Sequence, residues 1–141
     1  MTATTNPLGI TAVLPLSYEQ AINDVTAALK EQGFGVLTEI DVKATLKKKL
    51  DVDVRPYVIL GACNPPLAHR ALSTDPIAGL MLPCNVVVYD NGDGTTTVSA
   101  INPMVAIGAV GNPALNGVAE TATNKLNIVM ANLLQTVNEP A

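Results

Sequence analysis

The feature that most constrains the fold is a β-hairpin signal in the second half of the chain. Residues 85–90 and 95–102 are rich in β-branched side chains, and the sequence Asn91-Gly-Asp-Gly94 separates them. Asn-Gly and Asp-Gly supply the positive φ angles that tight hairpin turns require, so the two runs are predicted to pair antiparallel. The sheet that contains them therefore includes an antiparallel pair.

The rest of the chain alternates between short apolar runs and segments of helical periodicity. Between Ser17 and Gly33, apolar residues recur every three or four positions, which predicts a helix. Ser17 forms a capping-box pattern with Gln20 at its start, and Gly33 suits a left-handed residue at its end. Asn64 before Pro65 predicts another helix start. The predicted strands are 9–14, 34–40, 55–62, 85–90 and 95–102, and the predicted helices follow Ser17, Asp41 and Asn64 and span 114–137.

This order predicts an α+β fold in a single domain at residues 9–137, with terminal tails at 1–8 and 138–141. The sheet is expected to be mixed or antiparallel, with helices mainly on one face and a long C-terminal helix. A doubly wound parallel sheet is the alternative. Neither GxGxxG nor GxxxxGK[ST] occurs in the chain, so nucleotide binding loses its usual support.

Composition limits the partners. Only 14% of the residues are charged, against about 25% in an average globular domain, and 48% are hydrophobic. The net charge of -4 and the 3% of aromatic residues argue against nucleic-acid binding. The apolar run at 58–60 is typical of a strand covered on both faces or lying in a subunit interface. A homodimer is therefore predicted, with the apolar segment from Pro103 to Pro113 as an ordered loop that lines a pocket or an interface.

Two features of the sequence, at its N-terminus and in its most apolar stretch, predict a cytoplasmic protein. The N-terminal segment has no basic residue before its short apolar stretch, and that stretch is too short for the core of a signal peptide. The most apolar stretch, 101–115, is interrupted by two prolines and two glycines and is too short to cross a membrane. No membrane association is expected.

Three segments carry a resemblance to a known family: Tyr57–Pro65, Gly79–Tyr89 and Asp93–Pro103. With the flanking helices, they resemble the domain of unknown function 302 family over almost the whole chain. The resemblance implies a small α+β domain that is dimeric, and it implies no particular activity. Both cysteine segments match the family pattern, whereas His69 departs from it.

Cys63 is the sharpest candidate for a functional side chain. It lies one residue before the predicted cap Asn64, and the positive end of a helix dipole favours a thiolate. If the strands that carry Cys63 and Cys84 are antiparallel neighbours, the two thiols lie at the same edge of the sheet. A buried, inert cysteine is the alternative interpretation.

Three functions remain open on these residues. The first is a dimeric module that binds a small ligand or a metal, with Cys63, Asn64, Cys84, Asn85 and Met104 as ligand-binding residues. Its metal ligands would be Cys63, Cys84 and His69, and soft donors of this kind suit a soft metal or haem iron. The second is a thiol enzyme in which Cys63 is the nucleophile of a redox or sulfur-transfer reaction. The third is a protein-interaction domain with inert thiols.

Overall fold

The sheet of the computed structural model, which describes residues 7–138, has five strands, and all neighbours are antiparallel. The order across the sheet is β1-β5-β4-β3-β2. The α+β prediction is confirmed, and the parallel alternative is wrong because every pair of neighbouring strands in the sheet is antiparallel. The strands are β1 (Gly9–Leu14), β2 (Gly35–Asp41), β3 (Tyr57–Cys63), β4 (Cys84–Asp90) and β5 (Thr96–Ile101).

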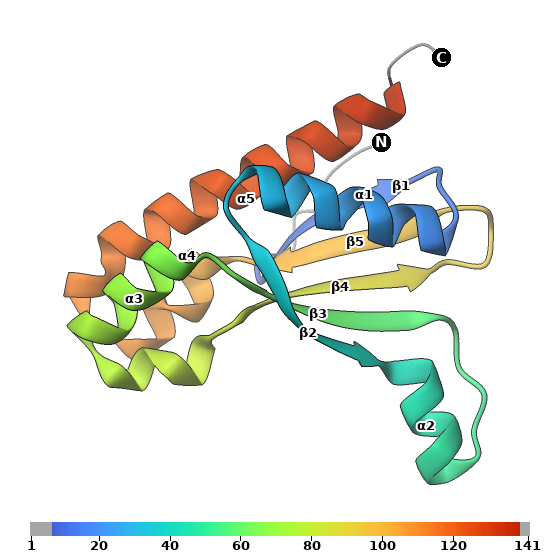
Figure 1. Cartoon of the computed structure of the whole chain (residues 1–141), viewed down its shortest axis with the longest axis horizontal. Coiled ribbons are helices and arrows are strands. Elements are labelled where there is room, and N and C mark those ends of the chain that lie inside the picture. Colours follow the sequence, from blue (N-terminus) through green and yellow to red (C-terminus); the bar gives the residue numbers. More distant parts are fainter. Residues whose placement is uncertain (1–6, 139–141) are drawn as a thin grey trace.

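One face of the sheet is covered by two helices, α1 (Tyr18–Glu31) and α5 (Asn116–Asn138) (Figure 1). Alternate strand residues point to this face and meet the apolar stripes of the helices, which is where the main core forms. The largest fully buried side chains of that core are Leu14, Val25, Leu29, Val58, Leu60, Val86, Val88, Val98, Leu126 and Val129.

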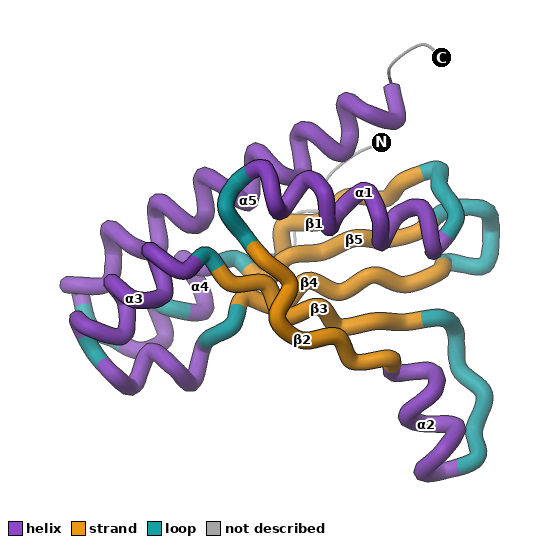
Figure 2. Tube along the Cα trace, viewed as in Figure 1, coloured by secondary structure: helices purple, strands orange, loops and turns teal. Residues whose placement is uncertain are grey.

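A second, smaller core lies beyond one end of the sheet (Figure 2). It is formed by α3 (Pro65–Thr74), the 3-10 helices η1 (Pro76–Met81) and η3 (Pro113–Leu115), and the first turns of α5. The segment predicted as a loop from Pro103 to Pro113 is instead helical, with α4 (Pro103–Ala106) and η2 (Gly108–Val110). Asn102 caps α4 and Pro103 suits its first position, a start signal that the loop prediction overlooked.

Side-chain caps fix the helix starts at predicted places. The Ser17 hydroxyl accepts a hydrogen bond from the Gln20 amide at 3.2 Å, but the Gln20 side chain donates to Asp24 instead of returning to the cap, so only half of the predicted capping box forms. The Asp41 carboxylate accepts from the Ala44 amide at 2.9 Å and starts α2 (Val42–Leu50). Gly33 has the positive φ of 83° that was expected after α1.

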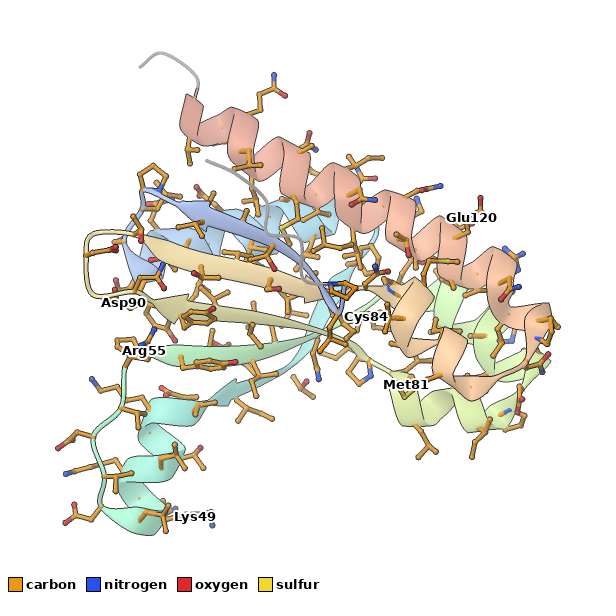
Figure 3. The ribbon with its side chains drawn as sticks, turned by 180° about the vertical axis from the view of Figure 1, so that it is seen from behind. Lys49, Arg55, Met81, Cys84, Asp90 and Glu120 are labelled. Carbon is orange, nitrogen blue, oxygen red and sulfur yellow. The ribbon has the colours of Figure 1, made fainter. Side chains whose placement is uncertain are left out.

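No helix among residues 7–138 covers the second face of the sheet. Figure 3, which views the molecule from the side opposite to Figure 1, has this face toward the reader. The register of the strands places twelve side chains there, and we call them the open face: Thr11, Val13, Thr38, Ile40, Tyr57, Ile59, Asn85, Val87, Tyr89, Thr97, Ser99 and Ile101. The predicted tails extend into residues 1–6 and 139–141, which lie outside the described residues.

Candidate functional site

The two cysteines lie at the end of the sheet that faces the second core. β3 and β4 are antiparallel neighbours, and Cys84 is paired with Ala62, the residue before Cys63. The sequence argument that the two thiols lie at one edge is therefore confirmed. Cys63 is half-buried and Cys84 is 7% exposed, and both are free thiols.

Both cysteines line a small cavity between the sheet end, α3 and α5. Its volume is about 30 Å³, and its other walls are almost entirely apolar, including Phe34, Leu67, Ile107 and Val118. A cavity that binds a ring such as benzene measures about 150 Å³, whereas a single water needs about 10–15 Å³. The cavity therefore has room for a water-sized molecule and none for an organic ligand.

Burial controls the chemistry of Cys84. Removal from water disfavours a thiolate, and this desolvation, with a smaller contribution from the neighbouring Cys63, raises the pKa of Cys84 to about 11. At neutral pH the Cys84 thiol is protonated. A protonated, buried thiol is a poor nucleophile and a poor metal ligand, which favours a packing role for Cys84.

Asn64 joins the ends of two helices. Its side-chain oxygen accepts from the Leu67 amide at 3.3 Å, which caps α3, and its Nδ2 donates to the Gln32 carbonyl at 3.2 Å, at the end of α1. Asn64 is 8% exposed, so both hydrogen bonds are shielded from water. Its predicted capping role is confirmed, and both ends of its side chain already have protein partners.

The remaining predicted site residues are dispersed. Asn85 is exposed on the open face, Met104 is 45% exposed on α4, and His69 is exposed on α3; Met104 and His69 do not line the cavity of the two thiols. Within residues 7–138, no three His, Cys, Asp or Glu side chains gather in a way that could hold a metal ion. A metal site at Cys63, Cys84 and His69 would thus need ligands from a second subunit.

The open face is the feature that the site prediction missed. None of its twelve side chains is charged, although no other described part of the chain forms a layer over this face of the five-stranded sheet. Antiparallel sheets with one solvated face normally alternate apolar and polar residues. The period-two runs 57–61, 85–89 and 97–101 contain the signal, because neither of their alternating sets carries a charge.

Two tyrosines stack on neighbouring strands of this face, near the end where β3 begins and β4 finishes. The rings of Tyr57 and Tyr89 stack with centroids 5.3 Å apart and planes 8° from parallel, and the Arg55 guanidinium lies 5.6 Å from the centre of the Tyr89 ring. On β1 and β5, the hydroxyls of Thr11 and Ser99 are 2.6 Å apart and share a hydrogen bond.

A shallow depression of about 560 Å³ runs across these strands. Apolar and aromatic side chains form most of its walls, with hydroxyl and amide groups between them. Its volume is within the range of about 300–1,000 Å³ that is usual for small-molecule sites. Its lining includes Val13, Tyr57, Asn85, Val87, Tyr89, Thr97, Ser99 and Ile101.

The fold and the site define a class: a single α+β domain whose antiparallel sheet is covered by helices on one face and, as far as residues 7–138 are concerned, has no helical layer on the other. Residues 10–133 match the model of the family described as domain of unknown function DUF302, and the chain belongs to this family. The resemblance seen in the sequence is confirmed.

A solved structure agrees. The chain is similar to the protein described as "uncharacterized conserved protein DUF302 from Bacillus stearothermophilus", with 30% sequence identity and a TM-score of 0.80. The similarity covers 94% of this chain and 100% of that chain. The comparison with curated proteins gives no match. Among the described residues, no helix has the length and apolarity needed to cross a membrane.

Proposed function

We propose that the protein is a homodimeric binding module in which the open faces of two copies pack against each other and enclose a small-ligand site. The observation that carries the proposal is that none of the twelve side chains of the open face is charged; the one described cation stacked on them is Arg55, over the Tyr89 ring near the end of the sheet. Interface cores are depleted in charged residues and enriched in tyrosine, and packed sheets lie about 10 Å apart with interdigitating side chains. Val, Ile, Thr and Tyr side chains suit such packing.

The size of the open face is sufficient for a stable dimer. Five strands spaced about 4.8 Å apart, each about six residues long at about 3.4 Å per residue, give a footprint of about 500 Å². The accessible area of a corrugated face exceeds its footprint, and each partner in a specific interface contributes about 600–1,000 Å². Packing of two open faces would therefore bury an area near the lower end of this range.

The depression gives the dimer a place for a ligand. It lies in the face that would be covered, so two copies would bring two depressions of about 560 Å³ together at the subunit seam. Stacked tyrosine rings, hydroxyls and the Asn85 amide favour an uncharged molecule with a flat apolar part and hydrogen-bonding groups. The proposal thus moves the ligand site from the cysteine cavity to the open face.

The test is sedimentation velocity on a matched pair of lysine variants. Val87 lies on the open face in the middle of β4, opposite Ile59 on β3 and Ser99 on β5. Val87→Lys places a charge where the dimer excludes water, and Ile128→Lys places the same charge on α5, where the side chain is 45% exposed.

The wild type and Ile128→Lys should sediment as dimers at micromolar concentration, and Val87→Lys as a monomer with an unchanged circular dichroism spectrum. Native mass spectrometry of the dimer from its host should show one added small-molecule mass, which Val87→Lys loses. A monomeric wild type or a dimeric Val87→Lys would overturn the proposal.

A further inference from the structure

Small side chains create the depression on the open face. Gly9 and Thr11 on β1 pair with Ile101 and Ser99 on β5, and larger side chains on the neighbouring strand β4 line the depression with them. An added Cβ at Gly9 would lie 2.5 Å from the Ser99 hydroxyl oxygen, so a larger residue there would displace this hydroxyl. The glycine therefore leaves room for the hydroxyls of Thr11 and Ser99 in the depression.

The hydroxyls of the depression differ in their hydrogen bonds. The Thr97 hydroxyl both donates to and accepts from the Asn91 side chain, so it is satisfied within the chain. Thr11 and Ser99 share one hydrogen bond of 2.6 Å, which uses one of their two hydroxyl hydrogens. Thr11 is only 8% exposed, and neither hydroxyl has another hydrogen-bond partner among residues 7–138. This pair therefore offers one donor hydrogen to a molecule in the depression.

Asn85 offers both a donor and an acceptor at the same place. Its side chain is exposed, lines the depression and makes no hydrogen bond to another described residue. It also borders a smaller hollow of about 190 Å³, whose other side chains, such as Leu82 and Ala106, are apolar. In the proposed dimer this amide leaves water, and a polar group that is buried without a partner is destabilising. A ligand that supplies both an N–H and a carbonyl would satisfy it.

The two ends of the depression differ in charge. Asn85 and Tyr89 are four residues apart on β4, which is about 14 Å along the strand. Arg55 lies at the Tyr89 end, 5.6 Å from the centre of that ring. In Figure 3, Arg55 marks one end of the sheet, and Cys84, next to Asn85 in the chain, marks the other. A carboxylate bound at Asn85 would be buried far from this cation, which disfavours a charged group there.

We propose that the open-face site takes a flat aromatic amide or lactam with two fused rings. Its amide group lies against Asn85 and the Thr11–Ser99 hydroxyl pair, and its rings extend along β4 over Val87 toward Tyr89. The ligand N–H donates to the Asn85 oxygen, and the ligand carbonyl accepts from the Asn85 amide or from the spare hydroxyl. This inference rests on the proposed function, and it adds the ligand class, its orientation and Asn85 as the residue that determines specificity.

An NMR titration with three matched probes tests the head group. The probe 2-naphthamide has a donor and an acceptor, 2-acetonaphthone keeps the carbonyl without a donor, and 2-naphthoate carries a carboxylate instead. The ¹⁵N-labelled protein, dialysed to remove bound small molecules, should bind 2-naphthamide about tenfold more tightly than either analogue, which corresponds to about 1.4 kcal/mol. The largest shift changes should occur at the Asn85 side-chain amide and at Ser99.

Two leucine variants form a matched pair for the same titration. Asn85→Leu removes the amide from the depression, whereas Asn127→Leu makes the same change at an exposed position on α5. In Asn85→Leu, the preference for 2-naphthamide over 2-acetonaphthone should fall to within about twofold, and the Kd of the ketone should stay within about twofold of its wild-type value. Asn127→Leu should keep the tenfold preference.

Three results in the wild type would overturn the inference. They are equal Kd values for the three probes, no binding of any probe up to its solubility limit, and tightest binding of 2-naphthoate with its largest shift changes beside Arg55. An unchanged preference in Asn85→Leu would overturn the role of Asn85.

Sedimentation of the same samples separates this inference from the proposed function. A dimer that gives one of these results would leave the open-face dimer standing without an amide site. A monomeric wild type would overturn both.

Discussion

Alkaline pH should destabilise the protein through Cys84. Burial raises the pKa of this thiol from its ordinary value of 9.0 to about 11 in the folded chain. The folded state therefore holds the Cys84 proton more tightly than the unfolded state. The resulting stability is fully present below pH 9 and is lost as the pH rises through 11.

The magnitude follows from the size of the shift. One pKa unit corresponds to about 1.36 kcal/mol, so a shift of about two units gives about 2.7 kcal/mol. Tyr18 acts in the same direction at higher pH, because its pKa is raised from 10.0 to about 12. The contribution of Cys84 is thus obtained from the difference between the wild type and a variant without this thiol.

The assay is urea unfolding of the wild type, Cys84→Ala and Cys63→Ala at pH 8, 9, 10 and 11. Because the cavity is enlarged, Cys84→Ala should be less stable than the wild type by a roughly constant amount at pH 8 and 9. Above pH 9, its free energy of unfolding should decrease less steeply with pH than that of the wild type. Cys63→Ala is the matched control for removal of a thiol. If the free energy of unfolding depends on pH equally in the wild type and in Cys84→Ala, the reasoning is refuted.

Two further substitutions test the packing around the thiols. Asn64→Ala removes the two shielded hydrogen bonds at the ends of α1 and α3 and should cost about 1.5–3 kcal/mol in urea unfolding. Asn64→Asp keeps the cap but sets a carboxylate oxygen against the Gln32 carbonyl in a shielded site, so it should also be destabilising. In Gly61→Ala, the added Cβ would collide with the Thr38 hydroxyl on the neighbouring strand, so we expect a loss of about 1–2 kcal/mol. Gly35→Ala, with open space around it, should be neutral or stabilising and serves as the control.

Local signals explain why most of the fold could be predicted from the sequence. These signals act through hydrogen bonds between residues close together in the chain. The structure has helix caps at Asn64 and Asp41 and a turn at 91–94. The order of elements then limits the topology. The helical turns at 103–110 were missed because apolar content outweighed the cap signal of Asn102.

The candidate site was harder to predict because it depends on contacts between distant strands. The stacking of Tyr57 on Tyr89 joins residues 32 positions apart and follows only from the pairing of β3 with β4. The same pairing confirms the placement of Cys63 beside Cys84. Their small cavity and the burial of Cys84 depend on α3 and α5, whose position no local pattern specifies.

The most direct test of the open-face dimer is an isotope-filtered NOE experiment on a mixture of ¹³C-labelled and unlabelled subunits. Open-face packing predicts NOEs between subunits for the methyl groups of Val87 and Ile59 and the ring of Tyr89, and none for Ile128 on α5. Intersubunit NOEs confined to α5, or their absence at a concentration where the protein is dimeric, would contradict the account.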